Sequence, residues 1–399
     1  MISISEALKI IQRETFALRS ETVDLENSVG RVLAECVVAD MDLPPFDRSQ
    51  MDGFALKSDE TNNAPIKLKI IGESIAGKGF DGELKTGETV RIMTGARVPL
   101  GADAVQKIEN TRESDENFVE ILETAAPKQN IVWRADEIKK GERIFAAGER
   151  VTENMIASIA SFGYAKVKVF RKPKVAILAT GSEIVDIPQK PEKDQIRNSN
   201  SIMLEVFAKK AGAQTEVLPI AADDISNLKS QILEALKTSD VLLVTGGVSV
   251  GDYDFTKPAL REIGAEILFE KVSLKPGKPT VFARFDDKLI FGLPGNPVSV
   301  AVTFCLFARA ALLKMQGAKD FELKTSFAVA SRKIKGAPKR DSYLPVSVEA
   351  SEKGVLTIES LRFGGSSNFI AFARADALVF IPQNTFLDAG DVAQILYLP

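Results

Sequence analysis

The pattern of apolar and polar residues divides the chain into regions of different fold class. From residue 173 to 317, short apolar runs alternate with segments that carry apolar residues at helical spacing. Residues 174–180, KVAILAT, form a nearly continuous apolar run, which is typical of a strand buried on both faces. The alternation predicts a central doubly wound, mostly parallel α/β domain. We expect its strands at 174–180, 215–222, 240–247 and 288–294. We expect its helices at 201–212, with Asn200 or Ser201 as cap, and at 224–238, 255–264 and 297–315.

The flanking regions are rich in turns and strand patterns. Residues 43–140 contain short strand candidates such as IKLKIIGES and ETVRIMTG, which predicts a β-rich insertion. Residues 318–399 contain alternating runs separated by Gly, Asp, Asn and Lys, and this spacing predicts a small β-barrel or sandwich. Two further helices are expected, one near the N-terminus with Ser3 or Ser5 as its cap and one at 151–164.

The composition excludes several kinds of chemistry. The 399 residues contain no histidine, which rules out Ser-His-Asp triads, Cys-His dyads and HExxH zinc sites. The cysteines, Cys36 and Cys305, form neither a disulfide framework nor a CxxC metal site, and Cys305 lies in an apolar run that predicts core. A net charge of −3 argues against a nucleic-acid partner. The start does not resemble a signal peptide, and the longest apolar run contains Arg309 and is too short for a membrane span, so we expect a cytoplasmic protein with no membrane partner.

Carboxylates follow the predicted strands, at the edge where open parallel sheets bind ligands. Glu183 follows the first strand, Asp223 and Asp224 follow the second, and Asp252 and Asp254 follow the third. These acids are candidate ligands of Mg²⁺, because a hard cation prefers oxygen ligands beside phosphate. Helix capping is the competing interpretation for the aspartates, and it would account for one of the pair Asp223 and Asp224. No helical pattern begins directly after Glu183, so capping does not explain that residue.

A glycine-rich loop follows the third strand. It reads TGGVSVGDYD, and its candidate substrate-binding residues are Gly246, Gly247, Ser249 and Gly251. Backbone N–H groups of such a loop can approach phosphate without obstruction by Cβ atoms. A tight turn from strand to helix explains the glycines equally well.

Two more segments offer groups that hold anions. In PGNPVS, Pro294 precedes a predicted helix with Asn296 as N-cap and Pro297 as first residue, and the free amides of a helix start favour an anion. A well-capped helix without a ligand is the alternative. The segment EKVSLKPGKPT carries ammonium groups around a rigid Pro-Gly turn, a plausible place for an oxyanion, although surface lysines are usually only solvated. These lysines are Lys271, Lys275 and Lys278.

Taken together, several strings resemble the molybdopterin molybdenumtransferase family, the MoeA type that also forms the C-terminal domain of gephyrin. The matching strings, in order, are PPFDRSQMDGFA, RIMTGARVPLGADAV, ILATGSEI, RNSNSIML, VTGGVSVGDYDFTK, KPGKP and GLPGNPVS. They extend from about residue 43 to 299. One stretch departs from the family, because NIVWRADEIKKG keeps Arg134 but has the acids Asp136 and Glu137 in reversed order.

The resemblance implies a homodimer of elongated four-part subunits, with the active site between the α/β domain of one subunit and N-terminal segments of the other. The parts would be a linker domain of 1–42 with 141–172, a β-rich inserted domain of 43–140, an α/β molybdopterin-binding domain of 173–317 and a C-terminal β-barrel of 318–399. The functional positions that it implies are Asp52, Thr94, Glu183, Asp223, Asp254, Lys271, Lys275, Pro294, Pro297, Arg340 and Ser366. Of these, Asp52, Thr94, Glu183, Asp223 and Asp254 would be catalytic.

The implied activity is insertion of molybdate, the substrate, into adenylylated molybdopterin with release of AMP, supported by Mg²⁺. Contact with the adenylyltransferase of the same pathway is also expected. Three alternatives share the α/β module: an adenylylating nucleotidyltransferase, a gephyrin-like scaffold without activity, and a competence-damage type hydrolase. The two extra β-rich regions and the MDGFA and TGARVP strings favour insertion, and the retained acids argue against a scaffold.

Overall fold

The computed structural model describes residues 1–115, 117–248, 254–361 and 365–399. The chain divides into two compact units. Unit 1 consists of Met1–Glu35, Ala147–Ile156 and Lys166–Pro399, and unit 2 consists of Cys36–Ala146 and Ala157–Ala165. Helix α2 (Met155–Ser161) belongs in part to each.

A mixed six-stranded sheet forms the centre of unit 1. Its strands lie in the order β16-β13-β17-β21-β20-β18; the first four are parallel, and β20 pairs antiparallel with both β21 and β18. The parallel core confirms the doubly wound α/β domain, and the antiparallel edge was not predicted. The bounds are β13 (Lys174–Ala179), β16 (Gln214–Val217), β17 (Val241–Thr245), β18 (Glu266–Phe269), β20 (Val281–Phe285) and β21 (Lys288–Leu293).

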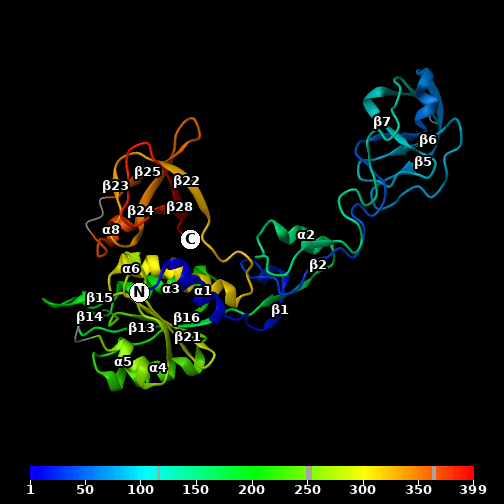
Figure 1. Ribbon diagram of the computed structural model, residues 1–399. Helices are drawn as coiled ribbons and strands as arrows, with labels where there is room; N and C mark the ends of the chain where they lie inside the picture. The colour runs from blue at the N-terminus through cyan, green and yellow to red at the C-terminus, as the bar shows by residue number, and fades with distance from the viewer. Residues whose placement is uncertain (116, 249–253, 362–364) are drawn as a thin grey trace. The chain divides into compact units, whose positions relative to one another are not determined.

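Helices cover both faces of this sheet (Figure 1). On one face, α1, α3, α6 and α7 enclose a core that contains Phe282 and Phe291; on the other, α4 and α5 pack on Leu178 and Leu242. Because both faces are covered, the central parallel strands β13, β17 and β21 are apolar along most of their length, whereas the edge strand β16 reads QTEV. The helices are α1 (Ile4–Glu14), α3 (Ser199–Lys210), α4 (Ile225–Thr238), α5 (Thr256–Glu262), α6 (Pro297–Thr303) and α7 (Arg309–Met315).

Side-chain caps begin several of these helices. The hydroxyl of Ser3 accepts a hydrogen bond from the backbone N–H of Glu6, which confirms the first of the two predicted caps of α1. Asp224 caps α4 by accepting from the N–H of Asn227. Helix α3 begins earlier than expected, because Asn198, rather than Asn200 or Ser201, accepts from the N–H of Ser201.

A single buried helical segment runs from α6 to α7 through a π-helical turn, Phe304–Ala308. Residues 297–315 are long and apolar enough to cross a membrane, but 89% of the most apolar window is buried inside the protein, as in a core helix. Cys305 is fully buried here, and this burial raises the pKa of its thiol to about 12. The thiol therefore serves as core, as its apolar neighbours predicted.

The C-terminal region of unit 1 is a closed five-stranded barrel. Antiparallel and parallel pairs connect β24 to β25, β25 to β22, β22 to β28, β28 to β26 and β26 back to β24. Closure leaves no free sheet edge among these strands. The bounds are β22 (Thr325–Ala330), β24 (Asp341–Ala350), β25 (Leu356–Ser360), β26 (Ala377–Ile381) and β28 (Val392–Tyr397), so the predicted barrel is confirmed.

Short elements complete unit 1. Strand β1 pairs antiparallel with β12, β14 pairs parallel with β15, β23 pairs antiparallel with β27, and β19 adds a parallel edge beside β24. A short helix, α8, follows residue 368. The bounds are β1 (Ser20–Asp24), β12 (Lys166–Phe170), β14 (Ile184–Val185), β15 (Ile196–Arg197), β19 (Leu274–Lys275), β23 (Ile334–Lys335), α8 (Phe369–Phe372) and β27 (Phe386–Leu387).

Unit 2 is built around a second six-stranded sheet. The order is β7-β4-β6-β5-β9-β8, and its core contains Phe54, Leu56 and Leu68. Two small ribbons, β10 with β3 and β11 with β2, lie outside this sheet. The bounds are β2 (Val37–Val38), β3 (Arg48–Ser49), β4 (Gly53–Leu56), β5 (Ile66–Ser74), β6 (Glu88–Ile92), β7 (Ala104–Lys107), β8 (Thr111–Asp115), β9 (Phe118–Ile121), β10 (Ile131–Val132) and β11 (Arg143–Phe145).

Candidate active site

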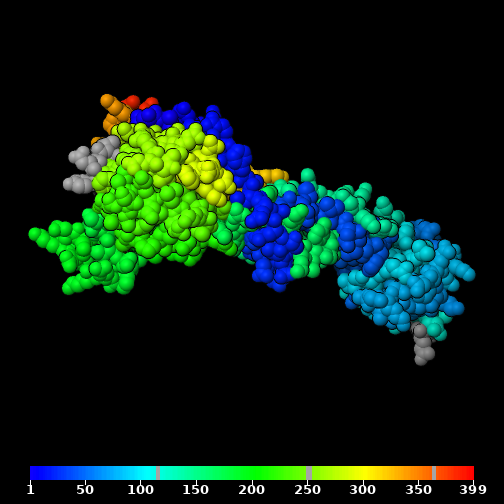
Figure 2. Space-filling model, turned by 90° about the horizontal axis from the view of Figure 1, so that it is seen from below, coloured from blue at the N-terminus to red at the C-terminus, as the bar shows by residue number. Residues whose placement is uncertain are grey.

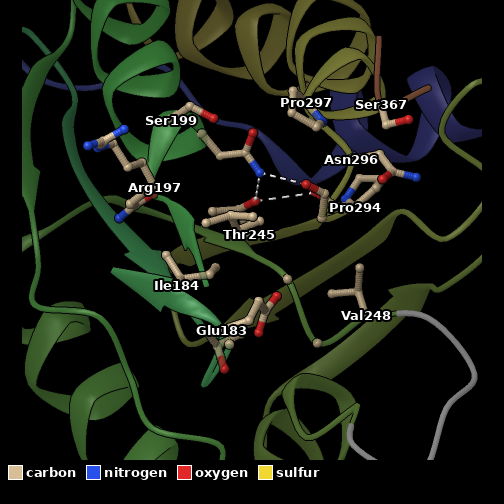
Figure 3. A pocket seen from close by; sticks show the side chains of 18 of the residues that line it. Glu183, Ile184, Arg197, Ser199, Thr245, Val248, Pro294, Asn296, Pro297 and Ser367 are labelled. Atoms are coloured by element: carbon tan, nitrogen blue, oxygen red, sulfur yellow. Dashed lines mark hydrogen bonds between the residues drawn. The ribbon is translucent and has the colours of Figure 1, made fainter. Parts of the chain in front are cut away.

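A cavity of about 940 Å³ lies at the carboxyl edge of the central sheet (Figure 3). The segments after β13, β16, β17 and β21 contribute to its lining, as does the C-terminal part of the chain through Ser367 and Phe369. A volume of this order accommodates a cofactor-sized molecule. The sequence-predicted residues that line it are Glu183, Asp223, Gly246, Gly247, Asp254, Pro294, Asn296 and Pro297.

Three carboxylates from three separate loops share this cavity. Asp223 accepts hydrogen bonds from the Thr180 hydroxyl at 3.1 Å and from the Ser182 N–H at 2.7 Å, so its position is set by the loop after β13. Asp224 instead caps α4, so the two adjacent aspartates have different roles. Asp254 directly precedes Phe255, the N-cap residue of α5, and lines the cavity together with the other two acids.

These carboxylates offer the oxygen ligands that Mg²⁺ prefers. Within the described ranges, no group of three acidic or cysteine side chains is gathered closely enough to form a preformed metal site. Asp223 already holds two hydrogen-bond donors. The donor set thus matches the predicted metal in chemistry, and the metal assignment stays a prediction.

The glycines of the third loop are required by the backbone. Gly246 has a φ of +98°, and a Cβ atom there would lie 2.3 Å from the Thr180 carbonyl oxygen. Only glycine fits so close an approach at positive φ. The tight turn therefore explains the glycine at position 246 without a ligand. Gly246 nevertheless lines the cavity together with Gly247. Ser249, Gly251 and Asp252 lie outside the described residues.

A hydrogen-bond network joins the loops after β17 and β21. The Asn200 side-chain amide donates to Thr245 Oγ1 at 3.1 Å and to the Gly295 carbonyl at 2.7 Å, and the Thr245 hydroxyl donates to the Pro294 carbonyl at 3.3 Å. Figure 3 draws these bonds around Thr245. The network sets the position of the PGNP loop, and sequence reasoning assigned Asn200 only a capping role.

The C-terminal region meets both predicted anion-binding segments. Asn296 is the N-cap of α6 as predicted, but its amide makes no capping bond and donates to the Ser366 hydroxyl at 2.9 Å. The Ser366 carbonyl accepts from Val298 N–H at 3.1 Å, so one of the helix-start amides expected to hold an anion is already paired.

Arg340 lies beside the lysine-bearing turn. It donates to the Leu274 carbonyl at 3.1 Å, next to the pairing of β19 with β24. Lys275 and Lys278 are exposed and Lys271 is half-buried, and none of the three lines the cavity, whereas Pro279 does. The structure therefore places the turn next to the cavity wall, and anion binding by its lysines stays a prediction.

Asp52 and Thr94 belong to unit 2, where they contact each other. One Asp52 carboxylate oxygen accepts from the Thr94 N–H at 2.6 Å and from its hydroxyl at 2.8 Å. These donors lower the pKa of Asp52, the backbone bond most, so the carboxyl group stays ionised. The altered stretch is also held here, since Asp47 accepts from the Arg134 N–H at 2.7 Å.

The fold and the cavity define a class: an α/β enzyme whose loops gather acids and a glycine turn at the carboxyl edge of an open sheet. Family models match most of the chain. The MoeA N-terminal region (domain I and II) matches residues 2–163, the probable molybdopterin binding domain matches 176–314, and the MoeA C-terminal region (domain IV) matches 328–398.

Relatives match over nearly the full length. Molybdopterin molybdenumtransferase of Staphylococcus epidermidis is 34% identical over 99% of this chain and 95% of its own, and that of Staphylococcus aureus is 35% identical over 96% and 91%. The crystal structure of the molybdopterin biosynthesis MoeA protein of Pyrococcus horikoshii has a TM-score of 0.85 at 31% identity and covers 100% of both chains. The chain belongs to the MoeA family of molybdopterin molybdenumtransferases, and it is a transferase of molybdenum cofactor biosynthesis.

Proposed function

We propose that this transferase inserts molybdate into adenylylated molybdopterin and releases AMP, with Mg²⁺ as its metal. The observation that carries the proposal is the cavity of about 940 Å³, in which Glu183, Asp223 and Asp254 meet the glycine loop. The relatives that are named molybdopterin molybdenumtransferase support the reaction. In it, the two dithiolene sulfurs of the pterin bind molybdenum, and their protons leave with one oxo ligand of molybdate as water. Water cleaves the phosphoanhydride bond of the adenylylated pterin, so that AMP leaves and the phosphate stays on the pterin.

Glu183, Asp223 and Asp254 would hold Mg²⁺ in this proposal. When bound, the ion would supply positive charge beside the adenylyl phosphate. The chain's own contribution is to orient the acids: Thr180 and Ser182 fix Asp223, and the Asn200 network fixes the PGNP loop opposite.

Molybdate would bind beside Lys271 and Lys275. It is a dianion without hydrogen-bond donors, so it needs cations or amides around it and is repelled by bare carboxylates. The pairing of β19 with β24 brings Arg340 next to the turn that carries Lys275, which adds a third cation from another region of the chain. The lysines of this turn do not line the acid-lined cavity. An anion bound beside them would therefore be repelled less by the carboxylates.

The direct test is incubation of the purified chain with adenylylated molybdopterin, Mg²⁺ and molybdate while AMP is measured. Molybdate-dependent AMP release is expected, and its absence with correctly folded protein would overturn the proposal. Titration of molybdate against Lys271→Ala and Lys275→Ala proteins tests the anion site. A raised molybdate requirement is expected, and an unchanged one would place molybdate elsewhere.

The working form in this proposal is a cytoplasmic homodimer that receives adenylylated molybdopterin from the pathway's adenylyltransferase. Asp52 and Thr94 would reach the cavity of the partner subunit, and the four-part division at residues 42, 140, 172 and 317 would describe each subunit. Light scattering at micromolar concentration tests the dimer: a monomeric mass with full activity would exclude it.

A further inference from the structure

One wall of the cavity is a continuous segment of the chain. Neither the sequence nor the proposed function assigns a ligand to this segment. Six consecutive residues line the cavity, from Gln195 to Asn200. The first three belong to a small arm that projects from the α/β domain (Figures 1 and 2), and the last three are the cap and first residues of α3. The arm consists of the β14–β15 ribbon and the segment 186–195 between its strands.

The charges on the cavity wall are unbalanced. Among the described residues that line it, Glu183, Asp223 and Asp254 carry negative charge and Arg197 alone carries positive charge. A phosphate ester that enters this cavity meets carboxylates on three loops. It therefore needs a cation in reach, and the lining supplies one.

The backbone holds Arg197 firmly in the wall. The N–H of Ile196 donates to the Glu183 carbonyl at 2.8 Å, and the N–H of Asn198 donates to the Val185 carbonyl at 2.9 Å. Arg197 is thus fixed between the acid-bearing loop and the start of α3. Figure 3 shows its side chain on the opposite side of the cavity from Asn296 and Pro294.

The guanidinium group remains available for a ligand. Its Nε donates to the Gln189 carbonyl at 3.1 Å, which orients the planar group against the arm. Arg197 forms no ion pair with any carboxylate in the described part of the chain, and its side chain is exposed. Its two terminal nitrogens can therefore bind two oxygens of one phosphate side by side.

We propose that Arg197 is the phosphate-binding cation of this cavity and holds a phosphate group of the adenylylated substrate. The inference rests on the proposed function and deepens it, because it separates two anion sites. Arg197 takes the phosphate ester within the acid-lined cavity, and the lysine-bearing turn takes molybdate outside it.

Calorimetric titration of AMP and adenosine into the protein with Mg²⁺ tests this proposal. Arg197→Gln removes the charge and keeps much of the side-chain length. We expect AMP to bind roughly tenfold more weakly, since a hydrogen bond to a charged group is lost, while adenosine binding stays unchanged. Arg197→Lys should restore part of the affinity for AMP. Lys193→Gln is the matched control, because Lys193 is an exposed cation of the same arm that does not line the cavity.

The outcomes separate the two proposals. Equal AMP affinity in the wild-type and Arg197→Gln proteins, with matching melting temperatures, overturns the role of Arg197 and leaves the proposed function intact. Failure of the wild-type protein to bind AMP also overturns the role of Arg197, whereas the proposed function falls only if molybdate-dependent AMP release is absent. A parallel loss of AMP and adenosine binding in Arg197→Gln identifies a structural role for the arm and also overturns the proposal. If Lys193→Gln loses as much affinity for AMP as Arg197→Gln does, the positive charge of the arm attracts AMP in general. Arg197 would then not form a specific phosphate site.

Discussion

Two regions of the molecule hold an aspartate in nearly the same way. Asp223, at the carboxyl edge of the central sheet, accepts from a threonine hydroxyl and a backbone N–H, and Asp52 of unit 2 does the same. Asp223 faces a cavity with two other carboxylates, whereas Asp52 does not line that cavity. Local hydrogen bonds therefore orient a carboxylate, but the groups around it decide which ligand it can bind.

The largest effect is expected at Asp223. Asp223→Ala should lower turnover by at least about a hundredfold, since a site carboxylate is lost, while the fold is kept. Asp224→Ala is the matched control: it removes the α4 cap, which should cost about 1 kcal/mol of unfolding free energy and leave turnover unchanged. AMP release and urea unfolding measure both. Equal turnover of the two variants would contradict our separation of the adjacent aspartates.

A mixing experiment tests whether Asp52 serves the cavity of a second subunit. Asp52→Ala and Glu183→Gln should each be inactive alone. Co-expressed, they should recover about a quarter of wild-type activity, because half the dimers are mixed and each mixed dimer has one intact site. Co-expression of Glu183→Gln with Asp223→Ala is the control, since both changes damage the same region and no site is restored. No recovery in the first mixture would remove Asp52 from the partner's site.

A third carboxylate sharpens the comparison because it lies at the other end of β17. Asp240 precedes that strand and accepts two hydrogen bonds of 2.7 Å from Arg171. Burial raises the pKa of Asp240, but bonds from Arg171 and the Lys174 N–H outweigh it, so the net pKa is lowered. Its stabilising effect is present above the unfolded pKa of about 3.9 and is lost as pH falls through the folded value.

Arg171→Met should therefore destabilise the protein by about 2–3 kcal/mol at neutral pH without changing turnover. The difference from wild type should shrink below about pH 4, as Asp240 becomes protonated in both proteins. Arg284→Met, which removes more exposed ion pairs with Glu14 and Glu266, is the control and should lower stability much less. Denaturant unfolding across pH measures both. A loss of turnover in folded Arg171→Met would contradict the purely structural role.

The smallest effect is expected at the contact between the barrel region and α6. Ser366→Ala removes the hydroxyl that accepts from Asn296, while the bond from Val298 N–H to the Ser366 carbonyl remains. We expect about 1 kcal/mol or less of stability to be lost and the affinity for the pterin substrate to change only a few fold. Thermal unfolding and substrate titration measure the two effects. Complete inactivation would instead place the Ser366 hydroxyl among the groups that touch substrate.

The sequence by itself determined the elements that depend on local pattern. The continuous apolar run of β13, the alternating strands of the barrel and the buried helix from Pro297 to Met315 follow from hydrophobic periodicity. The acids at the carboxyl edge followed from strand order, because parallel strands place their ends at one edge. Asp223 and Asp224 could not be separated in this way, since either aspartate satisfies the local requirement for a cap.

Only the tertiary structure decided which distant residues meet. The Asn200 bond to Gly295, the Ser366 contact with Asn296 and the Arg340 contact with Leu274 join segments far apart in the chain. Hydrophobic periodicity does not predict such pairings, because they depend on how sheets and helices pack in three dimensions. For the same reason the lysines of the turn could be proposed from the sequence and Arg197 could not, although Arg197 lines the cavity and the lysines do not. Packing of the small arm places its charge there.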